Sequence, residues 1–294
     1  MKLKAALLAS ALALSAWHGA RAEPPAPDPE PWRFTIAPYA WAVGITGNVT
    51  VRNQTIDTNA STIDLIQKSD SLIGWMTYLE ADKGPVGVYA DFVFAQLGFG
   101  AGQTNYHNPL AGLQITTRFN AALTYRLFIV EVGGLYELFR WPGSTPGTAT
   151  VLDGILGFRY WNNSVNATFD ASVNVDFSRP RLDHLDRTFG LAVARSDTIQ
   201  WVDPVIGLRL QHDLTPRQHI MVRGDVGGFG ISGSQFAWQA VATYGYSWQY
   251  TGYDVTALIG FRAIGVNYSQ GFGPDYFALN EILYGPIIGV SFRF

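Results

Sequence analysis

The sequence contains no cysteine, lysine is scarce, and no stretch after the first 22 residues approaches twenty consecutive apolar residues. Without cysteine, neither a disulfide framework nor a thiolate metal site can form. A helix needs roughly 20 apolar residues to span a bilayer, so the sequence predicts no transmembrane helix. Glycine, with 31 residues, and aromatic residues, at 14%, are abundant instead. Spread evenly at moderate hydropathy, they favour strands that are apolar on one side only.

The first 22 residues predict a removed export signal. Lys2 and Lys4 give a basic start, residues 5–16 form an apolar run, and an Ala-Arg-Ala pattern ends at Ala22. Signal peptidase cuts after such small-x-small patterns, so we expect cleavage after Ala22. The alternative, an N-terminal anchor helix, is disfavoured because the apolar run is too short to cross a bilayer.

The mature chain is acidic. Removing Lys2, Lys4 and Arg21 from the 20 basic residues leaves 17 against 23 acidic ones, a formal net charge of −6. An acidic chain has no general attraction for nucleic acid, so we expect no nucleic-acid partner. Residues 23–31 are rich in proline, which cannot donate to a strand ladder. We expect them to form a periplasmic lead-in before a single barrel domain at residues 32–294.

The segment 165–177 alternates in polarity over thirteen residues, with apolar side chains at odd positions and polar ones at even positions. Strands of soluble sheets are usually shorter, whereas a tilted membrane strand must cross about 9–11 residues of hydrocarbon plus two interfaces. The odd positions, Phe169 among them, are therefore expected to face lipid. The pattern predicts an all-β, antiparallel, up-and-down transmembrane barrel of about 12 strands. The strands are predicted at 32–44, 71–83, 86–98, 112–126, 128–141, 149–161, 164–178, 198–212, 217–229, 236–248, 253–267 and 281–294. The junction at 126–128 lacks a turn signal, and if it is one bent strand the count falls to eleven.

The connections separate by length onto two sides, as in outer-membrane barrels with short periplasmic turns and longer external loops. The predicted external connections are 45–70, 99–111, 142–148, 179–197, 230–235 and 268–280. The predicted periplasmic turns are 83–85, 126–128, 162–163, 213–216 and 249–252. The positions of the tryptophans near the ends of the predicted strands agree with a girdle of aromatic residues at each membrane–water interface. Those expected at inner strand ends are Trp32, Trp161 and Trp248, and those expected near outer ends are Trp141, Trp201 and Trp238.

The last strand alternates as a barrel strand should, with Ile288, Val290, Phe292 and Phe294 on one outward face. A terminal phenylalanine on such a strand resembles the signal that the bacterial barrel-insertion machinery reads. In a soluble protein this strand would be an unprotected edge. We therefore expect two partners, outer-membrane lipid and the insertion machinery, and a location in the cell outer membrane of a Gram-negative bacterium.

Five blocks of the sequence, at residues 37–41, 201–209, 224–230, 260–262 and 285–294, carry a resemblance to a known family. The first three are similar to family blocks, Gly-Phe-Arg at 260–262 matches a Gly-Tyr-Arg block with phenylalanine in place of tyrosine, and residues 285–294 resemble the family ending. The family is an uncharacterised proteobacterial outer-membrane β-barrel family that is porin-like. The resemblance implies the barrel fold and the outer-membrane location. It implies no activity, because a shared fold alone supplies none.

Successive residues of a strand face opposite sides of the sheet, so the odd or even position of a residue, here called its parity, decides which face it is on. Parity assigns the charged residues to the inside of the barrel. The expected lumen-lining residues are Glu80, Asp91, Arg118, Arg126, Glu131, Glu137, Asp153, Arg159, Asp170, Asp176, Asp203, Arg209, Arg223, Asp225, Arg262 and Arg293. All the cations are arginine, which makes planar two-point contacts with carboxylates. Two interpretations stay open: paired charges that fill and brace the lumen, or charges that line a water-filled path and select solutes. Arg223 and Asp225 are expected to tune conductance in the second case.

The sequence offers no clear catalytic constellation, and we expect no enzyme, no cofactor and no metal site. A lipid hydrolase needs a Ser–His arrangement facing lipid, but His107 and His184 fall in outer connections and His212 and His219 flank an inner turn. The leading function hypothesis is a passive or weakly selective channel for small solutes. The alternative is a plugged structural barrel whose external loops bind a partner. A lipid hydrolase is the third.

Overall fold

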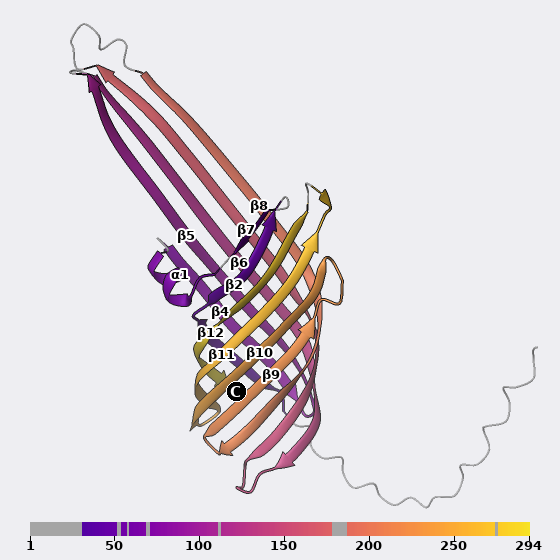
Figure 1. Ribbon diagram of the computed structural model, residues 1–294. Helices are drawn as coiled ribbons and strands as arrows, with labels where there is room; N and C mark the ends of the chain where they lie inside the picture. The colour runs from indigo at the N-terminus through magenta and orange to yellow at the C-terminus, as the bar shows by residue number, and fades with distance from the viewer. Residues whose placement is uncertain are drawn as a thin grey trace, which may run out of the picture. The chain divides into compact units, whose positions relative to one another are not determined.

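Strands with one apolar face can close on themselves, which removes the exposed edges of an open sheet. A computed structural model describes residues 31–294 apart from 52–53, 58, 69–70, 111–112, 178–186 and 274–275, and it shows such a closed sheet (Figure 1). The predicted signal at 1–22 and all but the last residue of the lead-in at 23–31 lie outside the described residues. The strands are β1 (Arg33–Trp41), β2 (Gly44–Val51), β3 (Gln54–Asp57), β4 (Ser71–Lys83), β5 (Val86–Leu110), β6 (Leu113–Pro142), β7 (Ala149–Phe177), β8 (Arg187–Thr215), β9 (Gln218–Gly227), β10 (Ser234–Tyr250), β11 (Tyr253–Gln270) and β12 (Phe277–Arg293). Helix α1 (Thr62–Lys68) lies between β3 and β4, and no helix in the described ranges is long and apolar enough to cross a membrane.

Ten strands, β1 and β4 to β12, form the closed barrel, because each pairs antiparallel with the next and β12 returns to β1. β2 continues the path of β1 after a break, since both pair with β12 at successive positions, and β3 folds back on β2. The break lies opposite Gly285 and Pro286. The Ala42 N–H donates to the Pro286 carbonyl at 2.9 Å, and a Cβ at position 285 would collide with the Ala42 carbonyl. The described sheet thus has 12 strand segments, as many as predicted, but they are different segments.

Two predicted turns are wrong, at 126–128 and at 162–163. The predicted strands 112–126 and 128–141 form the single strand β6, and 149–161 and 164–178 form β7. Pairing continues through both junctions without a register shift, with Leu127 opposite Asn163 and Asn163 opposite Ile199. No residue at either junction has a positive φ, which tight two-residue hairpin turns require. The barrel therefore has ten strands, neither twelve nor eleven.

The predicted connections are only partly confirmed, and their lengths do not separate cleanly between the two ends. The external connections predicted at 99–111 and 179–197 are mostly strand, because β5 continues to Leu110 and β8 begins at Arg187. The connection predicted at 45–70 contains β3, α1 and most of β2. Residues 84–85, 143–148, 216–217 and 251–252 join strands at one end, here called the inner end. The prediction of 142–148 as an external loop is wrong, because fusing two strands into β6 reverses the direction in which the chain reaches this turn. The chain also returns to the inner end, where Phe34 and Phe294 exchange backbone hydrogen bonds of 2.7 and 2.9 Å.

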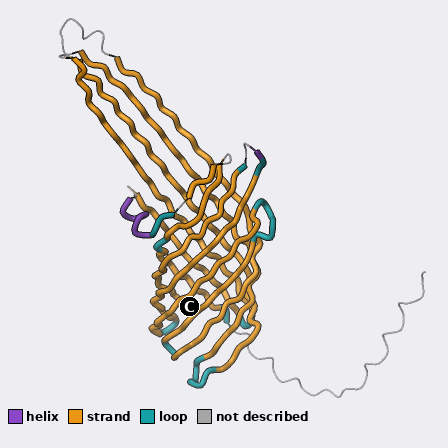
Figure 2. Tube along the Cα trace, in the orientation of Figure 1, coloured by secondary structure: helices purple, strands orange, loops and turns teal. Residues whose placement is uncertain are grey.

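Strands β5 to β8 are 25 to 30 residues long, whereas β9 to β12 have 10 to 18. The four long strands continue past the outer end of their neighbours as a four-stranded sheet (Figure 2). Residues 99–110, 113–123, 167–177 and 187–195 make up this sheet, which we call the extension. At about 3.3 Å per residue, residues 99–110 alone span about 40 Å along the strand.

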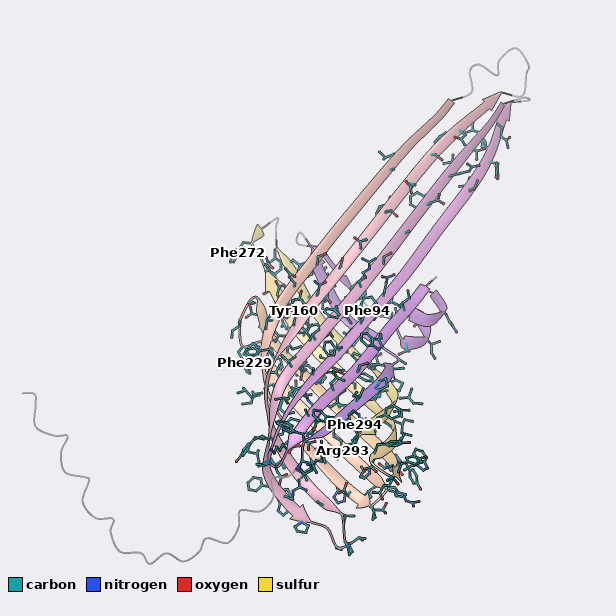
Figure 3. The ribbon with its side chains drawn as sticks, turned by 180° about the vertical axis from the view of Figure 1, so that it is seen from behind. Phe94, Tyr160, Phe229, Phe272, Arg293 and Phe294 are labelled. Atoms are coloured by element: carbon teal, nitrogen blue, oxygen red, sulfur yellow. The ribbon has the colours of Figure 1, made fainter. Side chains whose placement is uncertain are left out.

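The outside of the barrel carries an apolar band. Exposed apolar side chains on it are Val132, Leu156, Phe158, Val202, Ile206, Val222, Ile259, Ile288 and Val290. Aromatic rings flank the band: Figure 3 places Phe94 and Tyr160 near the base of the extension and Phe294 toward the inner end. Three tryptophan predictions are corrected. Trp141 lies at the inner end of β6, and Trp161 and Trp201 are buried inside the barrel.

Candidate functional site

An ion-pair network crosses the centre of the barrel. Arg159 on β7 contacts Glu131 on β6 and Asp225 on β9, each at 2.6 Å. Arg223 on β9 contacts the same two carboxylates, Asp225 at 2.9 Å and also Glu131. All four side chains are buried, and β6 and β9 are not neighbours in the sheet. The pairs therefore join different walls of the barrel across its interior.

A second part of the network comes from the opposite wall. Arg262 on β11 contacts Asp91 on β5 at 2.8 Å and donates to the Tyr39 hydroxyl of β1 at 2.7 Å. Its Nη2 donates to Gln239 Oε1 at 2.6 Å, and Gln239 Nε2 donates to Asp225 at 3.0 Å. Gln239 thus links both parts. Three arginines and three carboxylates balance one another within a single layer of side chains.

A further bridge lies closer to the inner end. Arg209 on β8 contacts Glu80 on β4 at 2.5 Å and Asp153 on β7 at 2.9 Å. The Tyr78 hydroxyl donates to Glu80 at 2.6 Å. Because β4 and β8 lie on opposite walls of the ten-stranded barrel, this bridge also crosses the lumen.

An aromatic layer covers the ion pairs on their outer side. Trp161 stacks on Trp201 with ring centroids 5.3 Å apart, and Trp201 stacks on Tyr268 at 4.4 Å. The Trp161 Nε1 donates to Asp203 at 2.9 Å. Aliphatic side chains from other walls complete the layer, and the buried ones include Val93, Ile129, Ile264 and Leu283. Aromatic and aliphatic burial of this kind excludes water from the charges beneath it.

Below the ion pairs, the barrel holds a cavity of about 780 Å³. Its lining reaches from Arg262 and Asp91 in the network to Arg33 and Arg293 at the inner rim. The cavity therefore occupies the inner half of the barrel. Within the described ranges, no group of three or more His, Cys, Asp and Glu is placed to hold a metal ion.

The structure gathers most of the expected lumen-lining residues inside the barrel. The buried network and its bridges contain Glu80, Asp91, Glu131, Asp153, Arg159, Arg209, Arg223, Asp225 and Arg262, and Asp203 is buried under the aromatic layer. Two others lie nearer the inner end: Glu137 contacts Arg140 at 2.5 Å, and Arg293 contacts Asp82 at 3.3 Å.

Three residues lie on the other face of their strands, which corrects the parity assigned to them. Arg118 and Arg126 are on β6 at positions that alternate with Glu131, and Asp170 on β7 alternates with Arg159. Because β6 and β7 are unbroken, alternation carries through and puts these residues outside, where all three are exposed. Asp176 pairs with Gln114 in the extension, but its side chain lies outside the described set.

Neutral residues complete the network, and the sequence reading missed them because it sorted only charges. Tyr39, Tyr78, Tyr89 and Gln239 each bond to a charged member of the network. Alternation along the strands already places two of them on the inward face, because Tyr89 shares a face with Asp91 and Tyr78 shares one with Glu80. Applying the same alternation to tyrosine and glutamine would have found them.

No protein-family model matches the chain, and no curated protein matches it. Similar solved structures include the attachment invasion locus protein Ail of Yersinia pestis, at 12% identity and a TM-score of 0.28, covering 90% of this chain and 99% of Ail. The translocator domain of autotransporter NalP from Neisseria meningitidis has 9% identity and a TM-score of 0.30, covering 91% of this chain and 90% of that one. A Pseudomonas aeruginosa FadL homologue has 8% identity and a TM-score of 0.26, covering 90% of each chain. Overlap at this level is too weak to transfer any of their properties, and the sequence-block resemblance stays a prediction.

Proposed function

We propose that this chain is an outer-membrane barrel with a closed lumen that presents its extension to a partner outside the cell. The observation that carries the proposal is the side-chain layer across the barrel centre. Arg159 and Asp225 are fully buried, and each makes ion pairs with residues of other strands. Charges that line an aqueous path keep contact with water, whereas these contact one another. This arrangement supports the plugged barrel over the solute channel.

A change of polarity along β7 supports the membrane location. Outward positions on the barrel side, such as Leu156 and Phe158, are apolar and more than half exposed. Outward positions in the extension, such as Thr168 and Asp170, are polar and exposed. Tyr160 lies between them and donates to Gln200 at 2.9 Å, as expected of an interfacial ring. The barrel portion thus suits hydrocarbon and the extension suits water. The short turns at the inner end favour the periplasm for that side.

The inward-facing side of the extension supports the interaction role. Phe119, Phe169, Val173 and Leu191 share this face and are 36–67% exposed. In register, Phe119 lies opposite Ala171, and Ala171 lies opposite Leu191, so the apolar positions adjoin across three strands. A contiguous exposed apolar patch on a water-facing sheet marks a binding surface. We infer a partner that offers an apolar contact surface.

Replacing Phe119 by aspartate should weaken adhesion roughly ten- to a hundredfold, because burying a phenylalanine contributes about 1.5–3 kcal/mol. The measurement is retention of intact cells displaying the barrel on an octyl-coated surface. Asn120→Asp is the matched control, since Asn120 is exposed on the opposite face of the same strand. Equal retention of both variants, with both barrels inserted in the membrane, would rule out this face as the binding surface.

A further inference from the structure

Three side chains at the inner end of the barrel form a hydrogen-bonded chain that the network above does not include. His219 Nδ1 lies 2.8 Å from Asp213 Oδ1, and His219 Nε2 lies 2.8 Å from Ser247 Oγ. Asp213 is on β8, His219 on β9 and Ser247 on β10, which are three successive strands of the sheet. We propose that these residues are a hydrolytic triad that cleaves short-chain carboxylic esters in the cavity.

The strand register builds this arrangement. Asp213 and His219 are directly opposite each other across the β8–β9 turn, and His219 is opposite Gly245 on β10. Ser247 lies two residues further along β10 on the same face, so the imidazole reaches it diagonally across the β9–β10 pair. Alternation puts all three side chains on the inside of the barrel. They are held by backbone pairing and therefore do not depend on a loop.

The hydrogen bonds fix where the protons are. A carboxylate only accepts, so the Nδ1–H of His219 donates to Asp213 Oδ1, and the Asp213 carboxylate is oriented by the Ala149 N–H, which donates to Oδ2 at 2.9 Å. In the neutral ring Nε2 must then accept, and its donor is the Ser247 hydroxyl. Thr256 lies 2.7 Å from Ser247 Oγ and can donate to it. A nucleophile beside a base that a third group orients is the pattern of an activated serine.

The cavity supplies access from the inner end. Asp213, His219 and Ser247 all line the cavity of about 780 Å³. Its far side is the closed ion-pair layer, so substrate and product use the inner mouth. Ser247 is 5% exposed, which restricts the reaction to esters with a small acyl group.

The reaction consumes one ester and one water. Ser247 Oγ attacks the ester carbonyl carbon while its proton moves to His219 Nε2. The bond to the alcohol oxygen breaks, and the alcohol leaves with the proton from Nε2. A water then attacks the acyl-serine and gives its proton to Nε2. The acyl–Oγ bond breaks, Ser247 regains the proton, and the carboxylic acid leaves.

The test uses the mature chain reconstituted in detergent micelles, with p-nitrophenyl acetate as substrate and a fluorophosphonate as serine probe. We expect hydrolysis above the buffer rate and a probe adduct that peptide mass spectrometry maps to Ser247. Ser247→Ala should remove the adduct and lower kcat by about 10²–10⁴-fold, as should His219→Gln. Asp213→Asn should slow labelling because a neutral amide does not stabilise the imidazolium that forms on His219 and can donate to Nδ1, which favours the wrong tautomer.

Ser291→Ala is the matched control, since Ser291 is an inward serine of the same cavity but not of the triad. It should keep the wild-type rate. If a variant fails to fold, the wild-type adduct still decides the question. A folded wild-type barrel whose Ser247 takes no probe, or whose hydrolysis equals that of Ser247→Ala, would show that the three residues only brace the turn. Neither result bears on the closed lumen or on the extension, which have their own tests.

Discussion

Replacing Arg159 by methionine is expected to destabilise the barrel by about 3–5 kcal/mol, because removal of one partner leaves buried charges without compensation. Arg159 contacts both Glu131 and Asp225 at 2.6 Å, and all three side chains are at most 1% exposed. Because methionine fills a volume similar to that of arginine, the loss of unfolding free energy comes more from the missing guanidinium charge than from a cavity. The measurement is urea unfolding of the barrel in lipid vesicles, followed by tryptophan fluorescence.

Arg126→Met is the matched control for this substitution. The sequence reading assigned both arginines to the lumen, but Arg126 is exposed on the outer wall and donates to Gln96 at 2.7 Å. Loss of an exposed polar contact should cost less than about 1 kcal/mol. Equal losses in both variants would contradict the buried network.

Replacing Leu156 by arginine should destabilise insertion by about 2–4 kcal/mol, the cost of a lipid-facing cation near the bilayer midplane. Leu156 is 70% exposed on the outside of β7, between the inner turn and the interfacial Tyr160. The residues paired with Leu156 on the two neighbouring strands are Gly134 and Ile206, and neither offers a counter-charge to a guanidinium. A refolding titration into vesicles gives the change in free energy.

Phe169→Arg, thirteen residues further along the same strand, is the control. Alternation in the sequence placed Phe169 against hydrocarbon, whereas the structure places it in the extension, on the inward face. The substitution should therefore leave insertion within about 0.5 kcal/mol of wild type. If Phe169→Arg is the damaging change and Leu156→Arg is not, the boundary between barrel and extension is wrong.

Alternation predicted the β class, the antiparallel pairing and most inward charges, because in a barrel each of these depends on local periodicity. It failed at residues 162–163, where an Asn–Asn pair resembles a turn. There the odd positions change from charged, as at Arg159, to apolar, as at Phe169. A strand that leaves the membrane inverts its polarity without changing direction. A reading of periodicity alone assigns that inversion to a new strand.

The alternation pattern of single strands could not predict the side-chain contacts between residues that lie far apart in the sequence. Arg209 and Glu80 are 129 residues apart, and Arg223 and Tyr89 are 134 apart. Parity gives the face of each residue, but the number of strands determines which wall faces which. An error of two strands therefore leaves the list of inward residues largely intact while hiding their partners. The Asp213–His219–Ser247 chain was hidden for the same reason, since its members became neighbours only once register was known.

The closed lumen is tested most directly by ion conductance. Wild-type barrel, shown to be folded by its heat-modifiable migration, is reconstituted into a planar bilayer in concentrated potassium chloride, with a general porin as positive control. The ion-pair layer and the aromatic layer above it predict a flat current trace in which the barrel adds nothing to the bare bilayer. Discrete and stable conductance steps that scale with the amount of folded barrel would contradict a closed lumen and restore the solute channel.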